Sequence, residues 1–303
     1  MSTPTVPHTP EEITALARRH GLAIVADSIR LNEAGLDYRV AYANADDGER
    51  WILRIPRRSG MGKSISAEAA VLAVVGQHLD VAVPQWQVAN EELVAYPELP
   101  GAPALTIDDG EPTFHVDVAS RTYAVEFGRL AAALQAIPRG ALTEAEVQDT
   151  TPEQVRAKHR ADLEQVATAF RVADDLLARW HAWLDTDSYW PEWTAFTHGE
   201  LYQAHVLVDQ QHRITGVLDW TTAGIGDPAS DLMMQKMTAP AQTFEETMRA
   251  FTEAGGHTWP RLEDHCVEMQ SFFPVGYGLY ALTTGDPEHA AAAQAGLNPP
   301  TEG

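Results

Sequence analysis

The chain has 303 residues, of which 45% are hydrophobic, and a formal net charge of −22. This length suits one large domain or two, and the negative surface repels nucleic acid and anionic membranes. The single cysteine, Cys266, excludes an intrachain disulfide and favours a reducing compartment. Residues 1–9 lack the basic and apolar segments of a secretory signal, and no apolar run reaches the roughly 18 residues that span a bilayer. We therefore expect a cytoplasmic protein.

The first 97 residues have the pattern of a small sheet with helices. A helix is predicted after Thr9, because Pro10 takes its first position and Glu12 completes a capping box. Strand-like segments follow, with an Asp-Gly turn between the second and the third. The further predicted elements are strands at 23–31, 38–43 and 51–55, a helix at 66–79, and strands at 85–89 and 93–96. This order predicts a mainly antiparallel sheet with one packed helix.

Composition changes at Pro97, where two prolines and a glycine within 97–101 predict a hinge at about 94–101. Residues 101–119 form a polar loop or a hairpin insertion, and the rest of the chain is mostly helical in pattern. Helices are predicted at 123–137, 152–184 and 265–282, and short strands at 204–208 and 214–220. We therefore expect an α+β fold with two lobes, residues 1–97 and 98–303.

Three polar features follow one another in the second half of the chain. The segment His198-Gly-Glu-Leu201 comes first, His205 stands five residues after Glu200, and Asp219 ends an apolar strand. A loop, a turn and a strand end can bring these side chains around one point. Phosphoryl transfer uses such a set, in which one carboxylate accepts the proton of the attacking hydroxyl and another carboxylate holds Mg²⁺ on the phosphates.

The same segments resemble a known family. Their order, HGELYQAHVLVD, then VLDW, then GDPASDL, is similar to the aminoglycoside-phosphotransferase-like small-molecule kinases, and within them to the macrolide 2′-phosphotransferases. The closer likeness depends on His205, where most relatives have Asn. Further matching segments are residues 32–39, 51–58, 83–84, 88–90, 93–97, 253–256 and 259–261. The resemblance covers nearly the whole chain and implies a bilobal protein-kinase-like fold, with a sheet-containing N-terminal lobe and a larger, mostly helical C-terminal lobe.

The resemblance implies roles for residues at the reacting phosphate. Glu200 takes the position of the catalytic Asp and faces the acceptor, while His205 and Asp219 take the positions of the metal ligands for Mg²⁺. Alternatively, His205 is a buried histidine that binds no metal. His198, Asp227 and Asp231 are expected to support the loop. The implied nucleotide is GTP, with ATP possible, and its expected contacts are Asn32, Gly35, Asp37, Tyr38, Arg54, Glu68, Tyr96 and Glu98.

Two positions depart from the family pattern. Glu200 is one methylene longer than Asp, and a displacement of about 1 Å at a reacting group can lower the rate roughly 100-fold. Arg54 replaces the usual lysine, and its planar, bulkier guanidinium binds phosphate oxygens differently. Arg57 or Arg58 could share that duty. The segment Gly60–Ser64 has part of a P-loop pattern, but its spacing fails and we interpret it as a flexible loop.

The acceptor side has weaker signals. Asp209 is a candidate acidic contact, and Phe273 and Tyr277 are candidates for an apolar wall, which would suit the apolar ring and cationic amino sugar of a macrolide. We predict a monomeric macrolide 2′-O-phosphotransferase that confers antibiotic resistance. Two alternatives stay open: a kinase of another hydroxylated small molecule such as an aminoglycoside, and a non-catalytic nucleotide- or ligand-binding relative.

Overall fold

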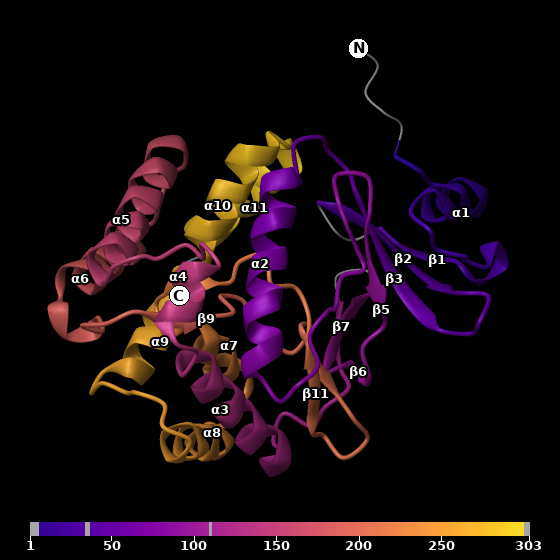
Figure 1. The fold of residues 1–303 in the computed structure, drawn as a ribbon. Helices are drawn as coiled ribbons and strands as arrows, with labels where there is room; N and C mark the ends of the chain where they lie inside the picture. Colours follow the sequence, from indigo (N-terminus) through magenta and orange to yellow (C-terminus); the bar gives the residue numbers. More distant parts are fainter. Residues whose placement is uncertain (1–5, 34–36, 109–110, 300–303) are drawn as a thin grey trace. The chain divides into compact units, whose positions relative to one another are not determined.

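The computed structural model describes residues 6–33, 37–108 and 111–299. Its contacts divide the chain into two compact units, and each contains segments that are distant in sequence. Unit 1 consists of Met1–His115, Pro138–Val147 and Gln203–Thr222, and unit 2 of Val116–Ile137, Gln148–Tyr202 and Ala223–Gly303. Figure 1 shows the elements of both. The division into lobes at residue 97 stays a prediction.

A five-stranded antiparallel sheet with the order β1-β2-β3-β5-β4 forms the centre of unit 1. Along the chain its elements follow the predicted succession of helix, three strands, helix and two strands, so the α+β class is confirmed. They are α1 (Pro10–Arg19), β1 (Arg30–Asn32), β2 (Tyr38–Asn44), β3 (Arg50–Pro56), α2 (Gly62–His78), β4 (Val88–Ala89) and β5 (Val94–Pro97).

The two faces of this sheet have different partners because side chains alternate along each strand. Thr9 caps α1 with the predicted capping box, and α1 packs its apolar residues on the face that carries Trp51, Leu53 and Ile55. The opposite face carries Ile52 and contacts Met61 and Ile65, around the start of α2. The central strand β3 is thus buried on both faces, and this places Arg54 in the interior.

Smaller elements complete unit 1, and some differ from the prediction. Residues 23–31 do not form one strand, because Ala26–Ser28 is a 3-10 helix; only β1 forms a strand there, and Ile24 makes an isolated bridge to Ala45. The segment after the predicted hinge forms an antiparallel hairpin, one of the two forms expected. The remaining elements are β6 (Ala102–Pro103), β7 (Leu105–Asp108), β8 (Glu111–Phe114), α4 (Arg139–Glu144), β10 (Val206–Val208) and β11 (Ile214–Val217), with the sheet order β11-β10-β6.

Unit 2 is mostly helical and contains one two-stranded sheet, β12-β9. Tryptophans 180, 183 and 190 form one core with Phe272 and Leu297, and Cys266 lies in a second core. Its elements are α3 (Arg121–Gln135), α5 (Pro152–Ala169), α6 (Asp174–Asp185), a 3-10 helix (Asp187–Tyr189), β9 (Ala195–Thr197), β12 (Gly224–Gly226), α7 (Ser230–Thr238), α8 (Ala241–Glu253), α9 (Leu262–Ser271), α10 (Phe273–Thr284) and α11 (Pro287–Leu297).

The predictions of two long helices in this part of the chain are wrong, because each predicted helix consists of two shorter helices. The predicted helix at 152–184 breaks after Ala169, where Phe170 turns to an extended backbone. The predicted helix at 265–282 breaks at Phe272, because Pro274 lies in the first turn of α10 and has no amide to continue α9. Among the helices that the structure describes, none is both long and apolar enough to cross a membrane.

Candidate active site

A buried ion pair stands at the centre of unit 1. Arg54 Nη1 lies 2.7 Å from Glu68 Oε1, and both side chains are almost fully buried. The strand register explains the burial, because Arg54 lies on the central strand β3 between its paired residues Val40 on β2 and Val94 on β5. Burial lowers the pKa of Arg54, but the neighbouring Glu68 carboxylate raises the pKa by a larger amount, so the net shift is upward. The guanidinium therefore stays charged inside the fold.

Aromatic rings hold the same guanidinium. Its central carbon lies 4.2 Å from the centroid of the Tyr38 ring and 5.7 Å from that of Trp86. Tyr38 is only 5% exposed, so its ring packs against the guanidinium and is not accessible at the surface. Cation–π contacts of this kind are worth about 0.5–2 kcal/mol, and together with Glu68 they fix the direction in which Arg54 points.

Asp219 follows β11 and has a left-handed backbone, with φ of 56°. Its Oδ1 accepts hydrogen bonds from the hydroxyl and the amide of Thr221, and its Oδ2 lies 3.8 Å from His205 Nε2. Burial raises the pKa of Asp219, but the Thr221 hydroxyl, His205 and Arg54 lower it, and the net shift is downward. The structure thus brings the two predicted metal ligands together and keeps the carboxylate ionised.

The side chains beside Asp219 fit a magnesium ion in part. An ionised carboxylate is a ligand that Mg²⁺ prefers, whereas imidazole is a more usual ligand of Zn²⁺, Cu or Fe. Within the described residues, no three His, Cys, Asp or Glu side chains group closely enough to hold a metal. Mg²⁺ usually binds through one or two carboxylates plus substrate phosphates and water, and Asp219 is consistent with that mode.

The predicted nucleotide contacts before Tyr38 lie near the exposed edge of the sheet. Asn32 is at the end of β1, opposite Val40, and is exposed. Asp37 pairs with Arg58 at 2.6 Å, so Arg58 is engaged there. Gly35 lies outside the described residues.

The predicted hinge contributes two residues of different character. Tyr96 is buried opposite Ile52 in the sheet, and burial raises the pKa of its phenol. Glu98 is partly exposed, and its carboxylate accepts a hydrogen bond of 2.8 Å from Arg50. At the end of this segment Gly101 has φ of 102°, and a Cβ there would lie 2.2 Å from the Thr215 hydroxyl.

In unit 2, a buried carboxylate holds the segment that carries Glu200. Asp231 Oδ2 accepts from the His198 amide and Oδ1 from the Gly199 amide, each at 2.9 Å, and the Leu201 amide also contributes. Burial raises the pKa of Asp231 to about 7, although these amides oppose the shift. Glu200 itself is exposed. Asp231 therefore fixes the backbone on both sides of Glu200 and leaves its side chain at the surface.

A second buried carboxylate belongs to a chain of hydrogen bonds that the sequence did not reveal. His265 Nε2 lies 2.8 Å from Asp227 Oδ2, and Trp183 Nε1 donates to His265 Nδ1 at 3.0 Å. Because an indole nitrogen only donates, Nδ1 must be unprotonated, and Nε2 donates to Asp227. Burial raises the pKa of Asp227, but His265 and the Ala229 amide lower it to a net downward shift. Asp227 therefore ties α6, α9 and the start of α7 together.

The predicted acceptor contacts do not all face open space. Asp209 closes its own turn, because its carboxylate accepts from Arg213 Nε at 2.8 Å and from two backbone amides; the Arg213 amide contributes most to the lowered pKa of Asp209. Phe273 and Tyr277 lie on α10 and are 43% and 40% exposed. The Tyr277 ring contacts Tyr280, with centroids 5.7 Å apart.

Several groups that orient the candidate residues have no signal in the sequence. Trp86 and Thr221 gave no signal in the sequence, because a lone tryptophan or threonine has many ordinary roles. His265 was placed only within a helix, and its contact with Asp227 joins residues 38 positions apart. Spacing along the chain cannot reveal such partners.

Comparisons with known proteins show the family to which the chain belongs. Residues 28–265 match the phosphotransferase enzyme family. The chain belongs to this family. An uncharacterized protein of Bacillus subtilis (strain 168), YcbJ, is 34% identical over 282 residues, which is 92% of each chain. The family membership predicted from the motifs is therefore confirmed.

Two solved structures are similar over nearly their whole length. The macrolide 2′-phosphotransferase MphH from Brachybacterium faecium, as apoenzyme, is 48% identical with a TM-score of 0.91, and the match covers 97% of this chain and 100% of that one. A macrolide 2′-phosphotransferase type I is 42% identical with a TM-score of 0.89, and the match covers 97% and 98%. These matches confirm the predicted fold.

Proposed function

We propose that this protein is a macrolide 2′-O-phosphotransferase. It transfers the γ-phosphate of GTP, or of ATP, to the 2′-hydroxyl of the desosamine sugar and so inactivates the antibiotic. The observation that carries the proposal is the 48% identity to a macrolide 2′-phosphotransferase over 97% of this chain. Membership of the phosphotransferase enzyme family supports the reaction class.

In the proposed reaction Glu200 positions the acceptor hydroxyl and takes its proton as the new bond to the γ-phosphorus forms and the bond to the β-phosphate oxygen breaks. The Asp231 hydrogen bonds to the neighbouring amides support this role, because a fixed backbone keeps the carboxylate in place during the reaction. A positional error of about 1 Å at such a group can lower the rate roughly 100-fold.

We propose that the nucleotide phosphates bind beside Arg54 and Asp219. Arg54 is charged and oriented by Glu68 and Tyr38, so it can donate to phosphate oxygens without first losing conformational freedom. Asp219, with His205 beside it, would hold Mg²⁺, which supplies charge neutralisation on the phosphates when bound. Asn32, Asp37, Tyr96 and Glu98 remain proposed contacts of the nucleotide.

The proposed function is tested by mass spectrometry of the drug. The purified protein with Mg²⁺ is incubated with erythromycin, and separately with kanamycin, each with GTP and with ATP. We expect the addition of one phosphoryl group to the macrolide and none to the aminoglycoside. Phosphorylation of kanamycin alone would replace the proposal with the aminoglycoside alternative, and binding of nucleotide without any product would favour a non-catalytic relative.

The role of Glu200 has its own prediction. Replacement of Glu200 by Gln or Ala is expected to lower kcat by about 10²- to 10⁴-fold, as loss of a general base does, while KM for the nucleotide changes little. Glu200→Asp keeps a carboxylate and serves as the matched variant that retains measurable turnover. Steady-state kinetics measure both constants. Unchanged turnover in Glu200→Ala would show that another group accepts the proton.

A further inference from the structure

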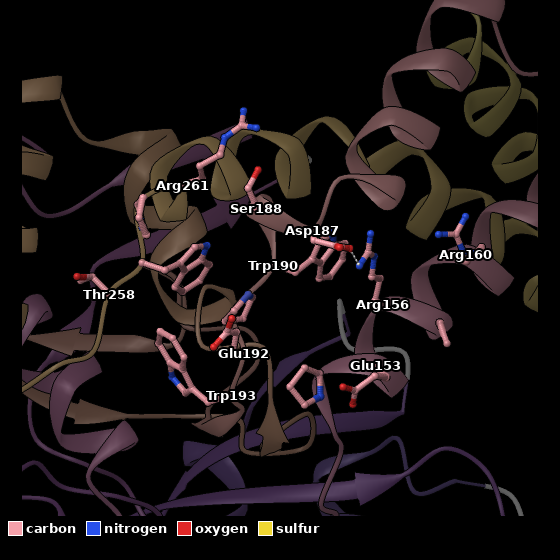
Figure 2. A pocket seen from close by; sticks show the side chains of 15 residues that line it. Glu153, Arg156, Arg160, Asp187, Ser188, Trp190, Glu192, Trp193, Thr258 and Arg261 are labelled. Carbon is pink, nitrogen blue, oxygen red and sulfur yellow. Dashed lines mark hydrogen bonds and ion pairs between the residues drawn. The ribbon is translucent and has the colours of Figure 1, made fainter.

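A cavity of about 1070 Å³ lies within unit 2. It is formed by the N-terminal half of α5, by the segment 187–193 before β9, and by the loop 258–261 before α9 (Figure 2). None of these segments carries a residue assigned above to phosphoryl transfer. The volume is slightly above the range of about 300–1000 Å³ that is common for small-molecule sites, so the cavity has room for a small organic ligand.

Three arginines line the cavity, and each is neutralised by a carboxylate. Figure 2 shows Arg156 joined to Asp187, away from Glu192 and Trp193. The ion pairs are Arg156–Asp187 at 2.6 Å, Arg160–Asp185 at 2.9 Å and Arg261–Asp264 at 2.9 Å. These arginines therefore do not make the cavity a site for an anion.

The lining itself contains equal numbers of arginines and carboxylates, and the excess of negative charge arises because Asp185 and Asp264, which lie outside the lining, pair with two of the arginines. Glu153 lies in the first turn of α5, where its own amide and the Thr151 hydroxyl lower its pKa. Glu192 lies beside Trp193, and across the described part of the chain no side chain makes an ion pair with it. A lining with neutralised arginines and additional carboxylates favours a cationic ligand.

Aromatic rings provide the apolar part of the lining. The rings of Trp193 and Trp259 are perpendicular, at 89°, with centroids 5.6 Å apart. Trp259 is fixed because its Nε1 donates to the Tyr189 carbonyl at 2.7 Å. Both are partly exposed. Tryptophan faces attract organic cations electrostatically, and perpendicular rings with a nearby carboxylate form the kind of site that binds quaternary ammonium groups.

We propose that this cavity binds an organic ammonium cation that carries apolar substituents. Trp193 and Trp259 contact the substituents, and Glu192 balances the charge. The proposal goes beyond the phosphotransferase activity and does not depend on it, because its evidence comes only from residues of the cavity and its test measures binding without nucleotide.

Choline and 3,3-dimethyl-1-butanol test the proposal, since they have the same shape and differ in charge. Each is titrated into ¹⁵N-labelled full-length protein while the indole N–H resonances of its eight tryptophans are followed; Trp193→Phe and Trp259→Phe identify two of them. We expect choline to shift these two resonances saturably. The uncharged analogue should bind at least about fivefold more weakly. Equal binding of both compounds, or no saturable shift of the two resonances, would overturn the proposal.

A matched pair of charge variants separates the site from the general negative surface. Glu192→Gln is expected to weaken choline binding about fivefold, whereas Glu164→Gln, an exposed position on the same unit outside the cavity, leaves it unchanged. Both variants remove one negative charge. Equal weakening in the two would mean that only the net charge attracts choline, and the proposal would be wrong.

Discussion

Arg54 shows how strongly a buried guanidinium depends on its neighbours. A lysine could point its ammonium at Glu68 from a flexible stem. A planar guanidinium instead packs its flat surface against an aromatic ring and donates hydrogen bonds to an acceptor in its plane. Tyr38 supplies a face at 4.2 Å and Glu68 an acceptor at 2.7 Å. The arginine is therefore built into the fold of unit 1 and cannot be exchanged independently of its partners.

The buried pair yields a stability prediction. Glu68→Gln leaves the Arg54 charge buried without its counter-charge, and we expect the free energy of unfolding to fall by about 3–5 kcal/mol, as when one partner of a buried pair is removed. The double substitution Arg54→Met with Glu68→Leu removes both charges and should recover most of that loss, while activity disappears. Urea denaturation measures the unfolding. A Glu68→Gln variant within about 0.5 kcal/mol of the wild type, the size of ordinary surface effects, would contradict the prediction.

At this scale the sequence indicates which side chains are candidates, but it does not show what surrounds them. His205 and Asp219 were expected near one another, and their side chains lie 3.8 Å apart. Tyr38 was expected to face the nucleotide, yet its ring is buried under Arg54. Motif spacing reflects which chemistry is needed, but burial depends on strand register, which a single sequence does not fix.

Among the secondary-structure elements, the contact between α3 and α8 depends on a glycine. A Cβ on Gly128 would lie 2.3 Å from the Thr247 carbonyl and 2.9 Å from the Phe251 amide, both in the backbone of α8. Backbone atoms cannot move aside as a side chain can. Gly128→Ala must therefore separate the two helices.

We expect Gly128→Ala to destabilise the protein by about 2–3 kcal/mol, the usual effect of overpacking a core. Gly140→Ala is the matched control, because Gly140 lies in α4 and a Cβ there meets nothing within 4 Å. Since alanine has the higher helix propensity, this control should be neutral or stabilising by up to about 1 kcal/mol. Thermal unfolding of both variants gives the comparison, and equal midpoints would contradict the predicted close contact.

The aromatic core of unit 2 yields a pH prediction through His159. Its ring lies 5.4 Å from the rings of both Trp183 and Phe272, and burial lowers its pKa to about 4. The unfolded chain binds this proton more tightly, so the contribution of His159 to stability is full above about pH 6.5 and is lost as pH decreases from there to about 4, by about 3 kcal/mol. The raised pKa of Asp231 acts in the opposite direction over the same window. His159→Phe removes only the first contribution, so its stability relative to the wild type should increase as pH falls from about 6.5 to 4, measured by denaturation at several pH values; a constant difference across these pH values would contradict the prediction.

The element boundaries show where a single sequence stops being informative. The order of the seven elements in the first 97 residues was predicted correctly because turns, caps and alternation agree there. Between α5 and α6 the residues Phe170 and Val172 continue an apolar helical pattern, and no glycine or proline marks the break. The break arises because both residues pack in the aromatic core, and this packing is tertiary. Between α9 and α10 the signal was present, in Pro274.

For the whole molecule, the net charge of −22 acts on both substrates of the proposed reaction. A cationic macrolide is attracted and an anionic nucleotide is repelled, and salt weakens both effects. Between roughly 0.05 and 0.5 M NaCl we expect KM for the macrolide to rise about two- to fivefold and KM for the nucleotide to fall. Initial rates at fixed Mg²⁺ measure this. If both constants moved in the same direction, a general effect of salt on the enzyme would be the cause.

The core of unit 2 also contains the chain's single cysteine, Cys266, which is 1% exposed. Burial raises the pKa of its thiol, and only the thiolate is reactive. An alkylating reagent can therefore modify this sulfur only in molecules that have opened around α9, so its reaction rate counts opening events in the unaltered enzyme. The same protection means that a second cysteine placed on the surface would accept a fluorophore or spin label alone, without prior removal of Cys266.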